Sequence, residues 1–330
     1  MKTIPFGKTD IKVTPIGLGT WAIGGWMWGG TDENQSIDTI RAAVDAGIGL
    51  VDTAPAYGFG RSEEIVGRAL AGGRRDKVAL ATKVALDWDA EQNKVWRDAS
   101  AARIKHEIED SLRRLQTDHI DIYQVHWPDP KTPMEETARA METLYRDGKI
   151  RAIGVSNFSP EQMEQFAQVA PLHSLQPPYN LFERQIEDAI LPYCRKHDIA
   201  TITYGGLCRG MLSGRMHEDR EFPGDDLRND DPKFQGDRFR QYLDAVAALD
   251  DFAQEYAGKN VLALALRWLI DQPDVTTALW GARRPEQLEP LKDIEGWSLD
   301  DNAMKRIDEI LAEHIKDPVG PEFLAPPERR

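Results

Sequence analysis

The 330-residue sequence predicts one α/β domain, folded as a (β/α)8 TIM barrel with an N-terminal β-hairpin and an extra C-terminal helix. The main observation is that short apolar runs, typical of buried strands, alternate with longer amphipathic segments eight times along the chain. The second is the length, because closed barrels regularly exceed ~200 residues as a single unit. No linker of biased composition divides the chain, so we expect residues 1–330 to form one domain.

The expected elements follow from this alternation in chain order. A hairpin covers residues 1–14, with turn-forming residues at 7–10. The expected barrel strands are residues 16–20, 50–54, 78–84, 120–126, 150–155, 174–176, 201–204 and 276–280. The expected helices are residues 34–46, 62–70, 100–115, 133–146, 261–269, 285–292 and 299–313. For the tail, residues 317–330, disorder is the simpler expectation, although residues 320–324 could close a pocket.

An open, doubly wound sheet is the alternative to a barrel. Such a sheet usually binds dinucleotides through Gly-x-Gly-x-x-Gly directly after its first strand. Here the first strand contains Gly17 and Gly19, and the glycines that follow do not fit that spacing. The barrel is therefore favoured, and it places the chemistry at the C-terminal ends of the strands.

Composition excludes several classes of function. The net charge of −14 opposes binding to nucleic acid or to anionic membranes. The most apolar stretch, residues 261–270, is too short to span a membrane, and the N-terminal residues do not resemble a signal peptide. Cys194 and Cys208 are too few for a disulfide framework. We expect a soluble, cytoplasmic protein that binds neither nucleic acid nor membranes.

Four titratable residues fall at or just after the ends of three consecutive expected strands: Asp52, Tyr57, Lys83 and His126. Tyr57 would hold its proton at neutral pH, Lys83 would lower its pKa, and Asp52 would be the counter-ion of Lys83. His126 would polarise a substrate oxygen or relay a proton. Taken singly, each residue could be a cap, a surface side chain or a core side chain. Together they can protonate an oxygen that gains negative charge, as hydride reduction of a carbonyl requires.

Longer motifs around these residues resemble the aldo-keto reductase superfamily. They are Asp52-Thr53-Ala54-Pro55-Ala56-Tyr57-Gly58, Ala81-Thr82-Lys83, Gln124-Val125-His126-Trp127, Gly154-Val155-Ser156-Asn157-Phe158 and Gln176-Pro177-Pro178-Tyr179-Asn180. Residues 204–210 are similar to bacterial members of the general-stress-protein and glyceraldehyde-reductase type. The resemblance implies a barrel that binds NADPH across its C-terminal mouth and reduces carbonyls reversibly. Tyr57 would then be the general acid.

The resemblance also implies a set of cofactor contacts. The residues expected around the nicotinamide are Thr20, Trp21, Asp52, Ser156, Asn157, Gln176 and Tyr204. The residues expected at the phosphates are Gly205, Gly206, Leu207, Cys208, Arg209, Gly281, Ala282, Arg283 and Gln287. Within this set, Arg209 would add charge at the pyrophosphate, and Arg283 would take the adenosine 2′-phosphate at a helix N-terminus. Many relatives hold the adenine with Glu-Asn where this chain has Pro290 and Leu291, so the preference for NADPH over NADH stays open.

Trp21, Trp28, Trp88 and Trp127 follow strand ends and are expected to wall an apolar substrate pocket. Residues 210–241 are expected to fold over the cofactor as a flap. The leading hypothesis is an NADP(H)-dependent reductase of small aldehydes, hydroxycarbonyls or sugar-derived carbonyls. It would be a monomer or a weak homo-oligomer without a metal. The alternative is a cofactor-sensing regulatory subunit with slow reductase activity, like the potassium-channel β subunits.

Overall fold

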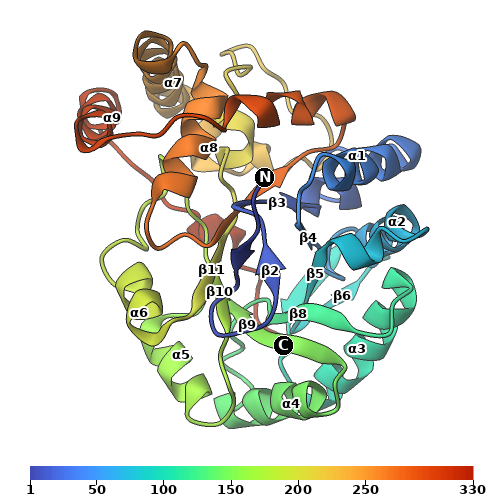
Figure 1. Cartoon of the computed structure of the whole chain (residues 1–330). Coiled ribbons are helices and arrows are strands. Elements are labelled where there is room, and N and C mark those ends of the chain that lie inside the picture. Colours follow the sequence, from blue (N-terminus) through green and yellow to red (C-terminus); the bar gives the residue numbers. More distant parts are fainter. Residues whose placement is uncertain (330) are drawn as a thin grey trace.

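The computed structural model describes residues 1–329 and shows a closed barrel of parallel strands surrounded by helices (Figure 1). The strands follow one another around the barrel in chain order, and the last pairs with the first at Ala278 and Ile16. They are β3 (Ile16–Gly19), β4 (Leu50–Asp52), β5 (Ala79–Val84), β8 (Ile120–Val125), β9 (Ile150–Ser156), β10 (Ser174–Gln176), β11 (Ala200–Thr203) and β12 (Thr277–Gly281). The predicted (β/α)8 barrel is confirmed.

Nine α-helices lie within residues 1–329. They are α1 (Glu33–Asp45), α2 (Arg61–Leu70), α3 (Ala101–Leu115), α4 (Met134–Arg146), α5 (Pro160–Ala167), α6 (Ile190–His197), α7 (Gly236–Ala257), α8 (Val261–Asp271) and α9 (Asp301–His314). The helix α9 is the expected extra C-terminal helix. Residues 285–293, where a helix was predicted for 285–292, form a 3-10 helix that contains Pro290. Within residues 1–329, no helix is long and apolar enough to cross a membrane.

Three helices and a hairpin appear where the sequence predicts none. The helix α7 begins inside the segment that was expected to be a flap, and it buries Phe239, Tyr242 and Leu249 along one side. Its many charged residues obscure that apolar stripe in the sequence. The helices α5 and α6 complete the alternation after β9 and β10. After β5, the strands β6 (Leu86–Asp89) and β7 (Lys94–Arg97) form an antiparallel hairpin instead of a loop.

The N-terminal hairpin closes one end of the barrel. The strands β1 (Ile4–Pro5) and β2 (Lys12–Val13) pair antiparallel, as predicted. Phe6, Ile11 and Val13 are buried from this hairpin and belong to the same apolar cluster as Leu50 and Ala200, which lie where barrel strands begin. The functional cavities must therefore open at the opposite end, where the strands finish.

The C-terminal tail is ordered rather than disordered, and it lies at the open end of the barrel. The Arg97 backbone amide donates to Pro327 O at 3.0 Å, and Arg97 Nε donates to Pro326 O at 2.8 Å. Arg329 forms a salt bridge with Asp98 at 2.8 Å. The tail is thereby held against β7 and the residue that follows it, so the expectation of disorder is wrong for the described part of the tail.

Candidate active site

Asp52, Tyr57 and Lys83 meet at the open end of the barrel. Lys83 Nζ lies 2.6 Å from Asp52 Oδ2, 2.9 Å from Thr53 O and 3.2 Å from the Tyr57 hydroxyl. An ammonium group has three protons to donate and no lone pair. Lys83 therefore donates to the Tyr57 oxygen, and the proton of Tyr57 remains free for another acceptor. The ring of His126 lies edge-on to that of Tyr57, with 5.7 Å between their centroids.

Two glycines hold the Tyr57 loop against the turn that follows β3. Gly58 has a φ of +67°, and a Cβ there would lie 2.1 Å from Gly24 O. A Cβ on Gly24 would in turn lie 2.5 Å from the Tyr57 carbonyl carbon. This close approach brings the rings of Tyr57 and Trp21 into a stack, with 6.0 Å between centroids and 25° between planes. Replacing either glycine would push the loop away and displace Tyr57.

Burial dominates the protonation of these groups. Burial, and then the Asp52 carboxylate, raises the pKa of Tyr57 well above its ordinary value. Burial lowers the pKa of Lys83, although Asp52 opposes that change. Burial, and then the Lys83 charge, lowers the pKa of His126 well below its ordinary value. The expectation that Lys83 lowers the pKa of Tyr57 is therefore not met, because burial and the Asp52 carboxylate raise that pKa. At neutral pH, Tyr57 is protonated and His126 is neutral.

Two cavities meet at Tyr57. The first has a volume of about 810 Å³ and contains His126, and the second is a groove of about 620 Å³ that contains Arg283. The residues that border both are Trp21, Tyr57, Gln176, Tyr204 and Leu324. A group bound in the first cavity and a group bound in the groove would thus touch beside the Tyr57 hydroxyl.

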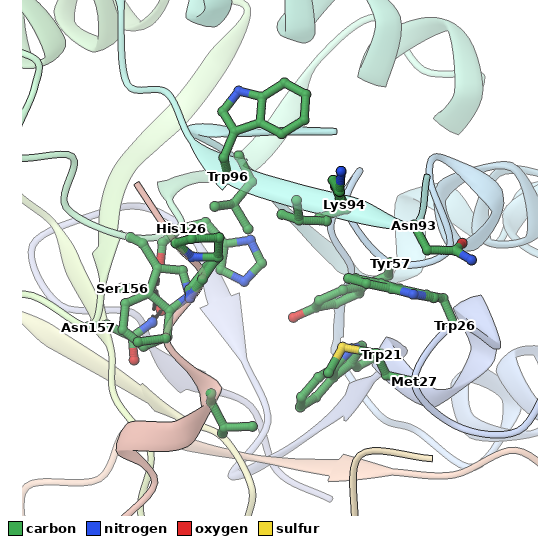
Figure 2. A pocket seen from close by; sticks show the side chains of 18 of the residues that line it. Trp21, Trp26, Met27, Tyr57, Asn93, Lys94, Trp96, His126, Ser156 and Asn157 are labelled. Atoms are coloured by element: carbon green, nitrogen blue, oxygen red, sulfur yellow. Dashed lines mark hydrogen bonds between the residues drawn. The ribbon is translucent and has the colours of Figure 1, made fainter. Parts of the chain in front are cut away.

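Aromatic and apolar side chains wall much of the first cavity. Figure 2 shows Trp21, Trp26 and Met27 on the side of Tyr57, with the Tyr57 hydroxyl pointing toward the side where His126 lies. Trp127 lines this cavity, as predicted. Met27 and Trp96 line it without having been predicted, and Trp26 lines it as well, whereas Phe323 and Leu324 belong to the segment 320–324 that could close a pocket. The last two come from the tail.

Two of the predicted pocket tryptophans lie elsewhere. Trp88 is not among the residues that line either cavity, and the Arg103 guanidinium lies 4.7 Å from its ring centroid. Trp88 lies in the unexpected β6–β7 hairpin, and its ring packs against Arg103 instead of lining the first cavity. Trp28 lines the groove instead of the first cavity and packs edge-on against Trp21 at 5.5 Å.

The groove is lined by glycines and by a high density of arginines for a protein of net charge −14. The arginines that border it are Arg209, Arg215, Arg220, Arg228, Arg283 and Arg284. Arg283 Nη1 donates to Trp28 O at 3.0 Å and to Gly30 O at 3.3 Å. Burial lowers the pKa of Arg283, and the positive charge of Arg228 lowers it further. Uncompensated positive charge of this kind is what a bound anion would neutralise.

Several groups expected at the phosphates are already bound within the protein. The Arg209 guanidinium is buried, where it forms ion pairs with Glu183 at 2.6 Å and with Asp231 at 2.8 Å. Its charge is therefore compensated, which corrects the expectation that it adds free positive charge. The Cys208 amide donates to Gly205 O at 2.7 Å and is not free for a phosphate.

The turn after β12 also differs from the expectation. Gln287 Oε1 accepts from the backbone amides of Arg283 and Arg284, at 2.8 and 3.0 Å, so these two amides are not free. Ala282 is buried in the core and does not line the groove. Gly205, Gly206, Leu207 and Gly281 do line it, as does Thr20. Near the turn after β12, the positive charge in the groove thus comes mainly from arginine side chains and not from free backbone amides.

Five of the residues expected at the nicotinamide are linked by hydrogen bonds: Asp52, Ser156, Asn157, Gln176 and Tyr204. Tyr204 donates to Asn157 Oδ1 at 2.9 Å, and Asn157 Nδ2 donates to His126 O and to Ser156 Oγ, both at 3.0 Å. Asn157 has a φ of +61°, which turns the chain directly after β9. Gln176 Nε2 donates to Asp52 Oδ1 at 2.8 Å. Among residues 1–329 no cluster of side chains is suited to hold a metal ion.

Comparison with known proteins identifies the class to which this site belongs. A profile of the Aldo/keto reductase family matches residues 15–312. The chain is 61% identical to the aldo-keto reductase YhdN of Bacillus subtilis (strain 168) over 330 residues, covering 100% of this chain and 99% of that protein. It is 38% identical to the NADH-specific methylglyoxal reductase of Escherichia coli (strain K12) over 301 residues, covering 87% and 91%.

A solved structure gives the same result. The glycerol dehydrogenase AKR11B4 from Gluconobacter oxydans superimposes with a TM-score of 0.88 at 55% identity, covering 98% of this chain and 99% of that one. The chain belongs to the Aldo/keto reductase family. It is accordingly an oxidoreductase of a family that acts on carbonyl compounds with nicotinamide cofactors.

Proposed function

We propose that this protein is an NADP(H)-dependent carbonyl reductase in which Tyr57 donates the proton. The observation that supports this most directly is the position of the Tyr57 hydroxyl, between the aromatic cavity and the arginine-lined groove. Its oxygen accepts from Lys83, so its proton can be passed to an oxygen in the cavity. A carbonyl bound there would meet a proton donor on one side and a ligand of the groove on the other.

The groove fits an elongated dianionic or polyanionic cofactor. Its lining combines glycines, which let a ligand approach the backbone, with arginines at one end and Tyr204 and Gln176 at the other. Arg283, with Arg220 and Arg284 nearby in the groove, would hold a 2′-phosphate, which supports NADP(H) over NAD(H). Ser156, Asn157, Gln176 and Tyr204 would hold the nicotinamide. When bound, the reduced cofactor supplies a hydride to the carbonyl carbon.

The protein's own side chains would handle the charge on the oxygen. His126 is neutral, so it can hydrogen-bond the carbonyl oxygen without giving up a proton. Tyr57 donates its proton to that oxygen as negative charge develops there, which completes the alcohol. Lys83 stabilises the resulting tyrosinate, and Asp52 keeps Lys83 charged in a buried site.

We further propose small aldehydes, hydroxycarbonyls or sugar-derived carbonyls as the substrates. The relatives named for glycerol and methylglyoxal support short oxygen-rich molecules. The outer part of the first cavity also offers Asp89, Gln92, Asn93 and Lys94, which can bind hydroxyl groups. We expect the enzyme to act in the cytoplasm as a monomer or a weak homo-oligomer, which size-exclusion chromatography with light scattering would test.

The deciding experiment is a cofactor titration followed by a carbonyl panel. Quenching of tryptophan fluorescence would give the Kd values of NADPH and NADH, since Trp21 and Trp28 border the groove. Oxidation of the preferred cofactor would then be followed with glyceraldehyde, methylglyoxal and open-chain sugars. We expect NADPH to bind more tightly and at least one of these carbonyls to be reduced. Tight cofactor binding without turnover of any carbonyl would reject the proposal.

A further inference from the structure

Gln124 contacts Asp52, one of the four titratable residues of the site, and has no part in the proton transfer described above. It is in β8, two residues before His126, and its side chain is completely buried. Gly154 on the neighbouring strand β9 makes room for it, because a Cβ at that position would lie 2.8 Å from Gln124 Cγ. A long polar side chain is therefore accommodated inside the barrel, where an apolar one would be the ordinary choice.

Gln124 contacts the oxygen of Asp52 that Lys83 leaves free. Gln124 Nε2 donates to Asp52 Oδ1 at 3.2 Å, and Gln176 Nε2 donates to the same oxygen at 2.8 Å. Lys83 donates to the other oxygen, Oδ2, at 2.6 Å. Donors on both oxygens prevent the Asp52 carboxylate from rotating. The orientation of the Asp52 carboxylate toward Lys83 thus depends in part on Gln124.

Gln124 also determines which way the Gln176 amide faces. Gln124 Oε1 accepts from Gln176 Nε2 at 3.3 Å, in addition to the bond from Gln176 to Asp52. If the Gln176 amide were turned over, its oxygen would face the Asp52 carboxylate and the Gln124 oxygen, and none of the three could donate. The Gln176 nitrogen therefore faces this pair, which leaves its oxygen free. Gln176 lines both cavities.

We propose that Gln124 is a positioning residue of this active site. It holds the Asp52 carboxylate in the orientation that serves Lys83, and it keeps the oxygen of Gln176 available to the carboxamide of a nicotinamide. The second part rests on the proposed function, in which the groove binds NADP(H).

Two substitutions at position 124 and a control separate this role from a packing role. Gln124→Leu keeps the approximate volume and removes both polar atoms. Gln124→Glu keeps the acceptor for Gln176 and, when protonated, can still donate to Asp52. Tyr123→Phe is the control, because the neighbouring Tyr123 is equally buried, has a hydroxyl with no partner, and lies on the opposite side of β8. Thermal unfolding would verify that each variant is folded.

The measurements are the Kd of NADPH by tryptophan fluorescence and kcat with the best carbonyl, both from pH 5.5 to 8.5. For Gln124→Leu we expect the Kd and kcat to worsen by about 10- to 100-fold at every pH, as for lost hydrogen bonds to a charged group. The new carboxyl of Gln124→Glu lies beside Asp52, so its pKa would be raised. This variant should approach wild-type affinity at pH 5.5 and lose it as the pH rises. Tyr123→Phe should match the wild type throughout.

A wild-type Kd and kcat for Gln124→Leu would overturn the proposal, as would an affinity of Gln124→Glu that does not change with pH. A failure of the Gln124 proposal can be distinguished from a failure of the proposed reductase function. If the wild type binds NADPH and reduces no carbonyl, the reductase proposal fails, yet the pH-dependent affinity of Gln124→Glu still decides the role of Gln124. If no cofactor binds, the crystal structure of Gln124→Leu decides it, by whether the Asp52 and Gln176 side chains have rotated.

Discussion

The Arg209 guanidinium and the Glu183 carboxylate form two parallel hydrogen bonds inside the protein, of 3.0 and 2.6 Å, with both side chains almost fully buried. Lys233 Nζ lies 2.8 Å from the same carboxylate and donates to Gly320 O of the tail at 2.9 Å. The Arg209 guanidinium also lies 5.6 Å from the ring centroid of Phe323. This buried ion cluster therefore joins the segment beneath the groove to the tail that walls the first cavity.

Removing Arg209 should destabilise the protein strongly. In Arg209→Met, Glu183 and Asp231 would lose their main partner while remaining buried, and a loss of about 3–5 kcal/mol is expected for such a broken buried pair. Urea unfolding followed by circular dichroism would measure it. As a control, Arg139→Met removes an exposed i,i+4 pair with Glu135 and should leave the midpoint nearly unchanged. A similar midpoint for both variants would contradict the importance of the cluster.

The same cluster should make stability depend on acidic pH. Burial alone would raise the pKa of Glu183, but Arg209 and Lys233 lower it from 4.5 to about 2. A carboxyl whose pKa is lower in the folded state stabilises the protein above pH ~4.5, and that stabilisation is lost as the pH falls toward 2. The shift corresponds to about 3 kcal/mol.

Glu183→Gln provides the comparison for this pH effect. At pH 7 the variant should be less stable than the wild type, and the difference should narrow as the pH falls from 4.5 toward 3. Urea unfolding at several pH values would follow the difference in free energy between the two proteins. A difference that stays constant over this range would show that Glu183 is not held ionised by its neighbours.

Tyr57→Phe should abolish carbonyl reduction and leave cofactor binding intact. The variant lacks the proton that the proposed reaction needs, so we expect kcat/KM to fall by at least about 100- to 10,000-fold. The ring remains, so its stack on Trp21 and the shape of both cavities are retained. Stopped-flow or steady-state oxidation of NADPH and a fluorescence titration would measure the two quantities. Appreciable activity in Tyr57→Phe would assign the proton to another group.

Arg283→Ala should weaken NADPH and spare NADH. The positive charge of Arg283 is paired only with the carbonyl oxygens of Trp28 and Gly30 among the described hydrogen bonds, so a phosphate would gain from it. We expect the Kd of NADPH to rise by about 10- to 100-fold and that of NADH to change little. Arg306→Ala, on the exposed side of α9, is the control. Equal losses for both cofactors would place Arg283 away from the 2′-phosphate.

The tail should contribute to substrate affinity. Leu324 borders both cavities, whereas Trp88 borders neither. Leu324→Ala should therefore raise the KM for a larger apolar aldehyde by about fivefold through lost apolar contact. Trp88→Ala should leave that KM unchanged, although it can reduce stability. If Trp88→Ala changes the KM and Leu324→Ala does not, the assignment of the cavity walls is wrong.

The barrel strands and the cluster of Asp52, Tyr57, Lys83 and His126 could be predicted from the sequence, because both depend on local pattern and on a simple topological rule. Parallel strands end at the same rim, so Asp52, Lys83 and His126 had to come close once the strands were located. The β6–β7 hairpin was not predicted, and the expected position of Trp88, which lies in this hairpin, was wrong. Its antiparallel pairing places Trp88 opposite Val95, which no periodicity of a loop would indicate.

Roles that depend on distant partners could not be predicted in this way. Nothing near Arg209 in the sequence indicates that Glu183 and Asp231 bind its side chain. The tail is a similar case, because Arg97 contacts Pro326 across 229 positions. Gln124 stood inside a recognised motif, but its hydrogen bond to Asp52 spans 72 positions and is visible only in the folded barrel. The NADP(H) preference and the regulatory-subunit alternative stay predictions.

The C-terminal tail walls the cavities, but it is not part of the closed barrel, so activity and fold can be lost separately. The pairing of β12 with β3 closes the barrel, and this pairing does not involve the tail. The end of the tail, residues 326–329, is held at the rim by hydrogen bonds and a salt bridge to Arg97, Asp98 and Lys131. Segments attached in this way detach more easily than a closed sheet unfolds. On gentle heating or in dilute urea, catalysis should therefore decline while the barrel remains intact, so inactivation would underestimate the stability of the fold.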